Sequence, residues 1–220
     1  MPKTSFWLRR STRCSFRSTF SVAAFRMGYY GGRLGRLVWT SPPTPGGGQR
    51  SAQIASTTRM VTAGWNPSLT VATTSWPPGT YLLKLVVPEG QSYVPITVRD
   101  DAGRSDLLVV HAVTTWQAYN SWGDHDLYDG PRADPALRST KVSFDRPYAG
   151  SGADEFVPNE LGVVATAERL GLDVSYATVI DVHQRPDLLA THRAITFLGH
   201  DEYWSLEMRN GVEAARDAGT

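Results

Sequence analysis

The chain has 220 residues, of which 41% are hydrophobic and 20% charged, so it is long enough for one large domain or two small ones. No apolar run approaches the roughly 18 residues that a membrane span requires, and a membrane partner is not expected. The single cysteine, Cys14, excludes an internal disulfide framework and a cysteine-based zinc site. We therefore expect a globular protein of the cytoplasm.

The net charge of +1 conceals an uneven distribution along the chain. All 21 acidic residues lie in 89–220, whereas half of the 22 basic residues lie in 1–88. A basic segment of this kind can bind nucleic acid. Here the basic residues are scattered among Gly, Pro, Trp and Val and do not form a helical cluster. A nucleic-acid partner is therefore not expected.

Residues 1–20 are rich in Arg and Ser and contain no acid. Arg9 and Arg10 hint at a twin-arginine export signal, but Arg13 and Arg17 interrupt the apolar stretch that should follow. The sequence does not support export. It predicts a disordered or misplaced N-terminus over residues 1–20.

Residues 21–103 read as short strands separated by turns. "SVAAFRMGYYGG" and "RLVWT" come first, followed by "TTRMVTAGW", "LTVATTSW", "GTYLLKLVVP" and "SYVPITVRD". Apolar residues alternate along these segments with a period near two, and Pro or Gly marks the breaks between them. Regularly spaced short strands predict an immunoglobulin-like β-sandwich over this part of the chain.

Residues 104–220 change to an alternation of strands and helices. "LLVVHAV", "DVSYATVID" and "RAITFLG" predict strands of a mostly parallel sheet. "EFVPNELGVVATAERLG", "RPDLLATH" and "SLEMRNGVEAARDAGT" predict the helices between and after them. The pattern predicts an α/β domain, and no strand follows its last helix, as expected of a C-terminally truncated domain.

Two of these strands lead into unusually polar loops. "LLVVHAV" continues into "TTWQAYNSWGDHDLYDG", and "AITFLG" continues into "HDEYW". Ligands of open parallel sheets bind beyond the carboxyl ends of the strands. If the two strands are neighbours, Tyr119 and Glu202 face one crevice.

Three motifs of this half, in this order, carry a family resemblance: "TWQAYNSWGDHDLYDG" (115–130), "SFDRPY" (143–148) and "GHDEYWS" (199–205). Together with the upstream "FRMGYYGG" and "PPGTYLLKL", they resemble the large (β) subunit of N,N-dimethylformamidase over roughly residues 22–220. The resemblance implies a sandwich followed by an incomplete amidotransferase-like α/β domain. It also implies an amidohydrolase that uses one ferric ion held by two tyrosines and a glutamate, with a histidine beside the glutamate.

Carried onto this sequence, the resemblance assigns Tyr81, Tyr119 and Glu202 as ligands of the iron and His200 as the catalytic histidine. The resemblance and the neighbouring polar residues together suggest a substrate pocket formed by Trp116, Asn120, Trp122, Tyr128, Asp201 and Trp204. Two phenolates and one carboxylate balance a trivalent cation. Three protein ligands leave positions for the amide carbonyl and for an activated water.

Each residue also has an ordinary structural interpretation. Tyr119 could be a packed core aromatic, and Glu202 a carboxylate favoured at a helix N-terminus. Asp201 could be a helix cap, and His200 a histidine bonded to backbone. Asp145 and Arg146 could pair or orient the loop that contains them.

Alternatives remain open for the chemistry as well. His111 and His125 could form a zinc site with Asp124 or Asp126, although no His-x-x-x-His spacing is present. No nucleophilic cysteine or Gly-x-Ser-x-Gly turn supports triad hydrolysis. The chain could also be an inactive fragment or a binding module of the same fold. For the enzyme, the resemblance implies a small amide substrate, a small partner subunit and homo-oligomeric assembly.

Overall fold

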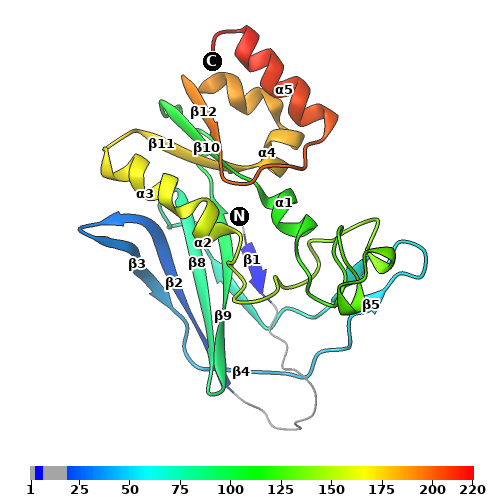
Figure 1. Cartoon of the computed structure of the whole chain (residues 1–220). Helices are drawn as coiled ribbons and strands as arrows, with labels where there is room; N and C mark the ends of the chain where they lie inside the picture. The colour runs from blue at the N-terminus through cyan, green and yellow to red at the C-terminus, as the bar shows by residue number, and fades with distance from the viewer. Residues whose placement is uncertain (1–2, 7–18) are drawn as a thin grey trace.

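The protein, described here as a computed structural model over residues 3–6 and 19–220, is a mixed α/β structure with an antiparallel and a parallel sheet (Figure 1). The strands are β1 (Lys3–Phe6), β2 (Thr19–Tyr30), β3 (Arg33–Thr40), β4 (Thr44–Pro45), β5 (Gln53–Ile54), β6 (Val61–Thr62), β7 (Leu69–Ala72), β8 (Gly79–Val87), β9 (Gly90–Val98), β10 (Leu107–His111), β11 (Val174–Thr178) and β12 (Ala194–Phe197). The α-helices are α1 (Val113–Ala118), α2 (Phe156–Asn159), α3 (Leu161–Arg169), α4 (Val179–Gln184) and α5 (Leu206–Asp217). Three 3-10 segments cover Pro131–Ala133, Pro135–Leu137 and Pro186–Thr191. Among the described residues, none of the helices combines the length and the apolar character that crossing a membrane would need.

The N-terminal segment that the sequence predicts to be disordered is described only in part. Lys3–Phe6 form β1, which pairs antiparallel with β7. β2 already begins at Thr19. The prediction for residues 1–2 and 7–18 falls outside the described residues.

The antiparallel sheet has the strand order β3-β2-β8-β9, with β4 paired to the start of β2. β2 and β3 form a hairpin across Gly31-Gly32, and β8 and β9 form a second, longer-paired hairpin. Side chains alternate between the two faces of a strand, so Leu82 and Leu83 of β8 enter different clusters. This alternation decides which side chains of β8 face the rest of the molecule.

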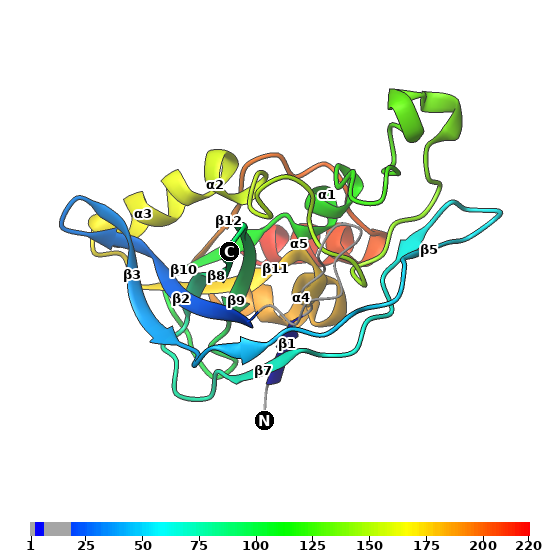
Figure 2. The same ribbon diagram turned by 90° about the horizontal axis from the view of Figure 1, so that it is seen from below.

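A β-sandwich is not confirmed. One face of the antiparallel sheet packs against helices, where Leu82 meets Trp116 and Phe156. Within the described part of the chain, the opposite face packs against Val71 of β7 and not against a second large sheet. Outside the two larger sheets, the described strands form two-stranded pairs, β1 with β7 and β5 with β6. Seen from below, the β2–β3 hairpin lies at one end of the molecule and β5 at the other (Figure 2).

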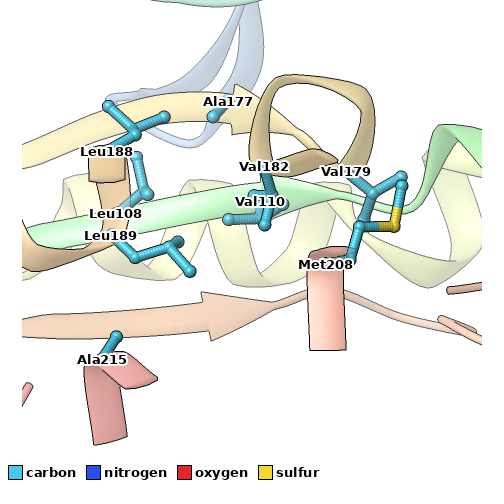
Figure 3. Packing of buried hydrophobic residues seen from close by; sticks show 9 residues of the cluster. All are labelled: Leu108, Val110, Ala177, Val179, Val182, Leu188, Leu189, Met208 and Ala215. Carbon is cyan, nitrogen blue, oxygen red and sulfur yellow. The ribbon is translucent and has the colours of Figure 1, made fainter. Parts of the chain in front are cut away.

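The parallel sheet has the order β11-β10-β12, with β10 in the centre. One face carries Leu108 and Val110, which pack with α4 and α5 residues such as Val182 and Met208 (Figure 3). The other face carries Val109, which packs against Val164 of α3. β10 is therefore buried on both faces, as its continuous apolar run predicts.

Two segments of this half differ from the elements that the sequence predicts. The predicted strand "DVSYATVID" ends at Thr178, because Thr178 and Asp181 form a capping box that starts α4. The predicted helix over 155–171 divides into α2 and α3 at Glu160, whose φ of −126° departs from helical geometry. The side chain of Glu160 is fully buried there, and its contacts explain the break.

Helix α3 lies between the two sheets. Its Glu168 forms an ion pair of 2.8 Å with Arg26 of β2 and accepts a hydrogen bond from Tyr176 of β11. Gly28 approaches so closely that a Cβ atom would lie 1.9 Å from Oε2 of Glu168. The upstream segment "FRMGYYGG", which contains Arg26 and Gly28, therefore joins the antiparallel sheet to the α/β half.

Candidate functional site

Tyr119 and Glu202 meet at the carboxyl edge of the parallel sheet. Tyr119 caps the C-terminus of α1, which follows β10, and Glu202 follows β12. β10 and β12 are paired neighbours, so their carboxyl ends open on the same edge. The hydroxyl of Tyr119 donates a hydrogen bond of 2.7 Å to Oε2 of Glu202.

Tyr128 and Tyr203 complete a cluster of phenols around this carboxylate. The hydroxyl of Tyr128 donates to the same Oε2 of Glu202 at 2.9 Å. The hydroxyl of Tyr203 in turn donates to that of Tyr128 at 2.8 Å. The rings of Tyr119 and Tyr128 stack with centroids 4.4 Å apart. One carboxylate oxygen thus collects two phenol donors from one loop.

His200 lies at the same point. Its Nε2 is 3.2 Å from Oε2 of Glu202, and its ring lies 5.0 Å from that of Tyr119. Its side chain is 48% exposed, so its ring is accessible from solvent. We refer to Tyr119, Tyr128, His200 and Glu202 as the Tyr–Glu–His cluster.

Two adjacent threonines of α1 hold the segment that carries His200 and Glu202. Oγ1 of Thr115 accepts hydrogen bonds from the backbone N–H groups of Glu202 and Tyr203, at 2.9 and 3.3 Å. The hydroxyl of Thr114 donates to the carbonyl of Tyr203 at 2.7 Å. The site therefore depends on direct bonding between the loops after β10 and β12.

Gly199 permits this segment to lie against α2. Its φ is +60°, in the left-handed region, and a Cβ atom would lie 2.8 Å from Cβ of Asn159 and 2.9 Å from its carbonyl oxygen. A larger residue would force the loop away from the helix. The backbone conformation and the contact with Asn159 thus explain why the first residue of "GHDEYW" is a glycine.

The electrostatics of the cluster follow from its hydrogen bonds. Those from Tyr119 and Tyr128 hold the pKa of Glu202 below its ordinary value. Burial, with the hydrogen bond to Tyr119, raises the pKa of Tyr128 to about 12. Hydrogen bonding with Tyr128 lowers the pKa of Tyr119, but burial and the bond to Glu202 outweigh it and raise it overall. In the metal-free protein at neutral pH, the phenols are therefore protonated and the carboxylate is ionised.

Tyr81 is not part of this cluster. It is fully buried in β8, and its hydroxyl donates to the carbonyl of Pro77 at 2.5 Å. Its ring packs on Trp76 at 4.9 Å, and burial raises its pKa. Because side chains alternate along β8, Tyr81 shares a face with Leu83 and not with Leu82, which packs toward α1. The second phenol beside Glu202 is that of Tyr128, which the sequence analysis assigns to the pocket wall.

The remaining predicted pocket residues are spread over several environments. Trp116 and Asn120 are buried in or beside α1 and line a cavity next to Tyr119. Trp122 packs edge-on against Trp65 at 5.5 Å, and Trp204 packs on Phe197 at 4.6 Å. Neither tryptophan lines that cavity.

Of the two acids in the segment 199–204, Asp201 points into the protein and Glu202 does not. Both of its carboxylate oxygens are inaccessible and accept no hydrogen bond of normal geometry. Burial raises its pKa to about 6, and the nearby Trp204 and His200 offset part of this effect. Asp201 is therefore not the helix cap that the sequence analysis considers. Ser205 caps α5, with its hydroxyl oxygen accepting from the N–H of Met208.

A buried polar network lies behind the site. Nδ1 of His111 is 2.5 Å from Oε2 of Glu160, and its Nε2 is 2.7 Å from the hydroxyl of Thr80. Oε1 of Glu160 accepts from the indole of Trp116 at 2.8 Å and from the N–H of Ala112 at 3.2 Å. Both His111 and Glu160 are completely buried. This network fixes the start of α1 to both sheets.

The zinc alternative does not fit these contacts. His111 is committed to Glu160, and Nδ1 of His125 lies 2.9 Å from the carbonyl of Leu137. Over residues 3–6 and 19–220, no group of three or more His, Cys, Asp or Glu side chains converges as metal ligands would. A metal at the carboxyl edge would therefore need the phenols as ligands.

Two adjoining cavities extend from Tyr119 along the carboxyl edge. The first, about 290 Å³, is lined by Tyr119, Asn120 and residues of the loop before α2. The second, about 340 Å³, is lined by apolar side chains that include Ile96, Phe144 and Ile180. Trp116, Tyr148 and Pro95 contribute to both cavities.

Three residues of the site and its surroundings are not predicted from the sequence: Tyr203, Thr115 and Glu160. The tandem hydroxyls of "VTTW", placed directly after a buried strand, signal a loop that bonds to its neighbour. An acid within the apolar helical pattern of "NELGVV" signals a buried carboxylate. No sequence pattern marks Tyr203 in this way, because its contact with Tyr128 depends on the three-dimensional position of Tyr128.

The fold and the cluster define an α/β protein with a carboxylate–phenol site at the carboxyl edge of its parallel sheet. The family described as N,N-dimethylformamidase beta subunit-like, C-terminal, matches residues 21–220. The chain belongs to this family, which confirms the resemblance read from its motifs. The search of curated proteins gives no match.

Proposed function

We propose that the protein hydrolyses the C–N bond of an amide, with one ferric ion held by Tyr119, Tyr128 and Glu202. The observation that carries the proposal is the convergence of two phenol oxygens and His200 on a single carboxylate oxygen. Family membership supports an amidohydrolase, and the geometry supports Tyr128 in place of Tyr81 as the second phenol.

The donor set suits a hard trivalent cation. Tyr119 and Tyr128 each place a hydroxyl within hydrogen-bonding distance of Glu202, so small movements would direct all three oxygens at one ion. The phenols are protonated without metal, and a strongly charged cation is the partner that makes them phenolates. Because Glu202 is ionised already, one negative charge is preformed.

The residues of the chain then divide the work of hydrolysis. When bound, the ferric ion supplies Lewis acidity, which polarises the amide carbonyl and lowers the pKa of water. Tyr119, Tyr128 and Glu202 would hold the ion, while Thr115 fixes the backbone beneath Glu202. His200 is placed to donate the proton that the departing amine nitrogen takes up, leaving a carboxylic acid and an amine.

The cavity beside Tyr119 is the proposed place of the non-reacting part of the substrate. Trp116 and Tyr148 give it aromatic walls, and the adjoining apolar cavity widens it toward Phe144. Together the cavities exceed the room that the smallest formamides need. We therefore favour amides with an apolar substituent. The family description "beta subunit-like" also supports assembly with a small partner subunit.

The iron content and visible absorption of the purified protein test this function. Iron tyrosinate absorbs visible light by charge transfer from phenolate to metal. We expect about one iron per chain and a visible band that weakens or disappears in Tyr119→Phe and in Tyr128→Phe. Tyr81→Phe is the matched control, because its hydroxyl donates to the carbonyl of Pro77 and does not reach Glu202.

The outcomes separate the possibilities. Retention of the band in Tyr81→Phe, with loss in Tyr128→Phe, supports the proposed ligands. The reverse result would return Tyr81 to the ligand set. Colourless, metal-free and well-folded protein that still binds amides would instead indicate a binding module.

A further inference from the structure

The loop that carries both phenols has little regular structure of its own. Tyr119 ends α1, and from Asn120 to Asp129 the chain forms only turns and bends. Yet Tyr119 and Tyr128 stack at 4.4 Å and reach the same oxygen of Glu202. The loop makes some bonds of its own, such as those from the N–H groups of Tyr128 and Asp129 to Oδ1 of Asp126, but the carbonyl groups that its turns leave unpaired need partners outside it.

Arg146, from the motif "SFDRPY", supplies those bonds. Its Nη1 donates to the carbonyls of Trp122 at 3.1 Å and of His125 at 2.8 Å. Its Nη2 donates to the carbonyl of Gln117 at 3.1 Å, and its Nε to the side-chain oxygen of Gln117 at 3.3 Å. One guanidinium therefore ties two positions of the loop to the last turn of α1.

Arg146 is buried, so its guanidinium depends on these hydrogen bonds. The residue is only 6% exposed. Burial lowers the pKa of its guanidinium to about 10, so the group is still cationic at neutral pH. Its hydrogen bonds go to carbonyl and amide oxygens, and the nearby Asp126 favours the charge. Placing a cation here is costly unless its donors are used, and all three of its nitrogen atoms are.

The residues that follow Arg146 continue the contact. The carbonyl of Pro147 accepts from Nδ2 of Asn120 at 2.9 Å, and Oδ1 of Asn120 accepts from the N–H of Ala149 at 2.9 Å. Residues 146–149 thus lie along the loop and are bonded to it. The side chain of Asn120, which is predicted to line the substrate pocket, forms both of these hydrogen bonds.

We propose that Arg146 is a positioning residue that pre-shapes the loop 117–128, so that Tyr119 and Tyr128 are in place before a metal binds. A lysine cannot replace it, because one ammonium group cannot span carbonyls of three residues in a fixed plane. The consequence for iron rests on the proposed function, whereas the consequence for the loop does not.

Hydrogen exchange of the metal-free protein, read by mass spectrometry, tests the loop directly. In Arg146→Gln and Arg146→Lys we expect amides of 117–130 to exchange at least about tenfold faster, while those of β8 and β10 keep their protection. The matched control is Arg138→Gln. Arg138 is exposed in the same connecting segment and donates to the carbonyl of Pro135 within its own turn.

Iron binding and chemical rescue complete the test. Ferric ion affinity, measured by competition with a chelator, should fall about 10- to 100-fold in Arg146→Lys, as for other residues that orient metal ligands. Millimolar guanidinium should restore loop protection in Arg146→Ala, and the same concentration of potassium chloride should not.

Two further outcomes decide against the role of Arg146, and a third decides only against the proposed function. Unchanged exchange over 117–130 in Arg146→Gln would show that the loop holds its shape unaided. If Arg146→Lys exchanges uniformly faster throughout the chain, or fails to fold, Arg146 is a general core residue and not a positioning one. If the wild-type protein binds no iron while the loop result holds, only the proposed function fails.

Discussion

The phenol oxygen of Tyr119 lies 2.7 Å from Oε2 of Glu202, although 83 positions separate the two residues in the sequence. The contact exists because β10 and β12 are adjacent parallel strands, so the loops beyond their carboxyl ends meet. It is the basis of the proposed chemistry and of most of the tests below.

Glu202→Gln should strongly weaken metal binding without unfolding the protein. The amide keeps an oxygen that can accept from Tyr119 and Tyr128, but it removes the negative charge that balances the cation. We expect ferric ion affinity to fall by more than about 100-fold, since residues that only orient ligands are already worth about 10- to 100-fold. Isothermal titration measures this. Glu207→Gln, at an exposed position five residues on, should bind normally.

Thr115→Val should loosen the segment that carries Glu202. Valine has a similar shape, but it leaves the N–H groups of Glu202 and Tyr203 without their acceptor. The free energy of unfolding should fall by about 1–3 kcal/mol in urea denaturation. Thr166→Val, on the exposed side of α3, is the control and should change it by less than about 0.5 kcal/mol. Equal effects at both positions would contradict the assigned role of Thr115.

Gly199→Ala should displace the His200–Glu202 segment. The new methyl group would clash with Asn159, and the left-handed backbone alone costs about 1–2 kcal/mol. Both stability and iron binding should therefore decrease. Gly162→Ala provides a control of opposite sign, because nothing lies within 4 Å of its Cβ position in α3. That helix should gain up to about 1 kcal/mol.

The pKa of Tyr128 predicts how stability depends on alkaline pH. The value is raised from 10.0 to about 12 in the folded protein. The unfolded chain therefore loses this proton first as pH rises, so the stabilisation is complete below pH 10 and is lost through pH 12. In metal-free protein, Tyr128→Phe should show a shallower decline across this interval. Denaturant unfolding at several pH values measures the difference, and identical slopes would show that Tyr128 is not shifted.

Phe144→Ala should change substrate preference more than catalytic rate. Phe144 lines the apolar cavity that adjoins the one beside Tyr119. In a series of amides with lengthening alkyl substituents, the wild-type KM should drop about fourfold per methylene. The variant should show a flatter series with kcat preserved. A flat series in the wild type would place the substrate elsewhere.

The rule that ligands bind beyond the carboxyl ends of parallel strands predicts from the sequence that Tyr119 and Glu202 lie close together. Tyr119 and Glu202 follow two buried strands, and the rule requires only that those strands be neighbours. Tyr81 shows where the inference stops. Its assignment came from resemblance, and whether β8 turns it toward or away from α1 depends on strand alternation against a partner layer that sequence does not specify.

The sandwich expectation stops for a related reason. Short strands with period two predict an antiparallel sheet, and that sheet is present. What covers its faces is a tertiary matter: α3 and Trp116 cover one face, where a second sheet was expected. Likewise the helix α4 begins within a predicted strand, because Thr178 and Asp181 cap each other, a local bond that outweighs the β-propensity of "VI".

The placement of α3 has a consequence for how this protein could be divided. Its Val164 belongs to the core of the parallel sheet, and its Glu168 holds Arg26 of the antiparallel one. Suppose that the chain were cut near residue 103, where the antiparallel strands give way to alternating strands and helices. The antiparallel sheet would then lose its contact with α3, and α3 would lose its ion pair with Arg26. Grafting the Tyr–Glu–His cluster onto another scaffold would therefore require both halves together with their shared helix.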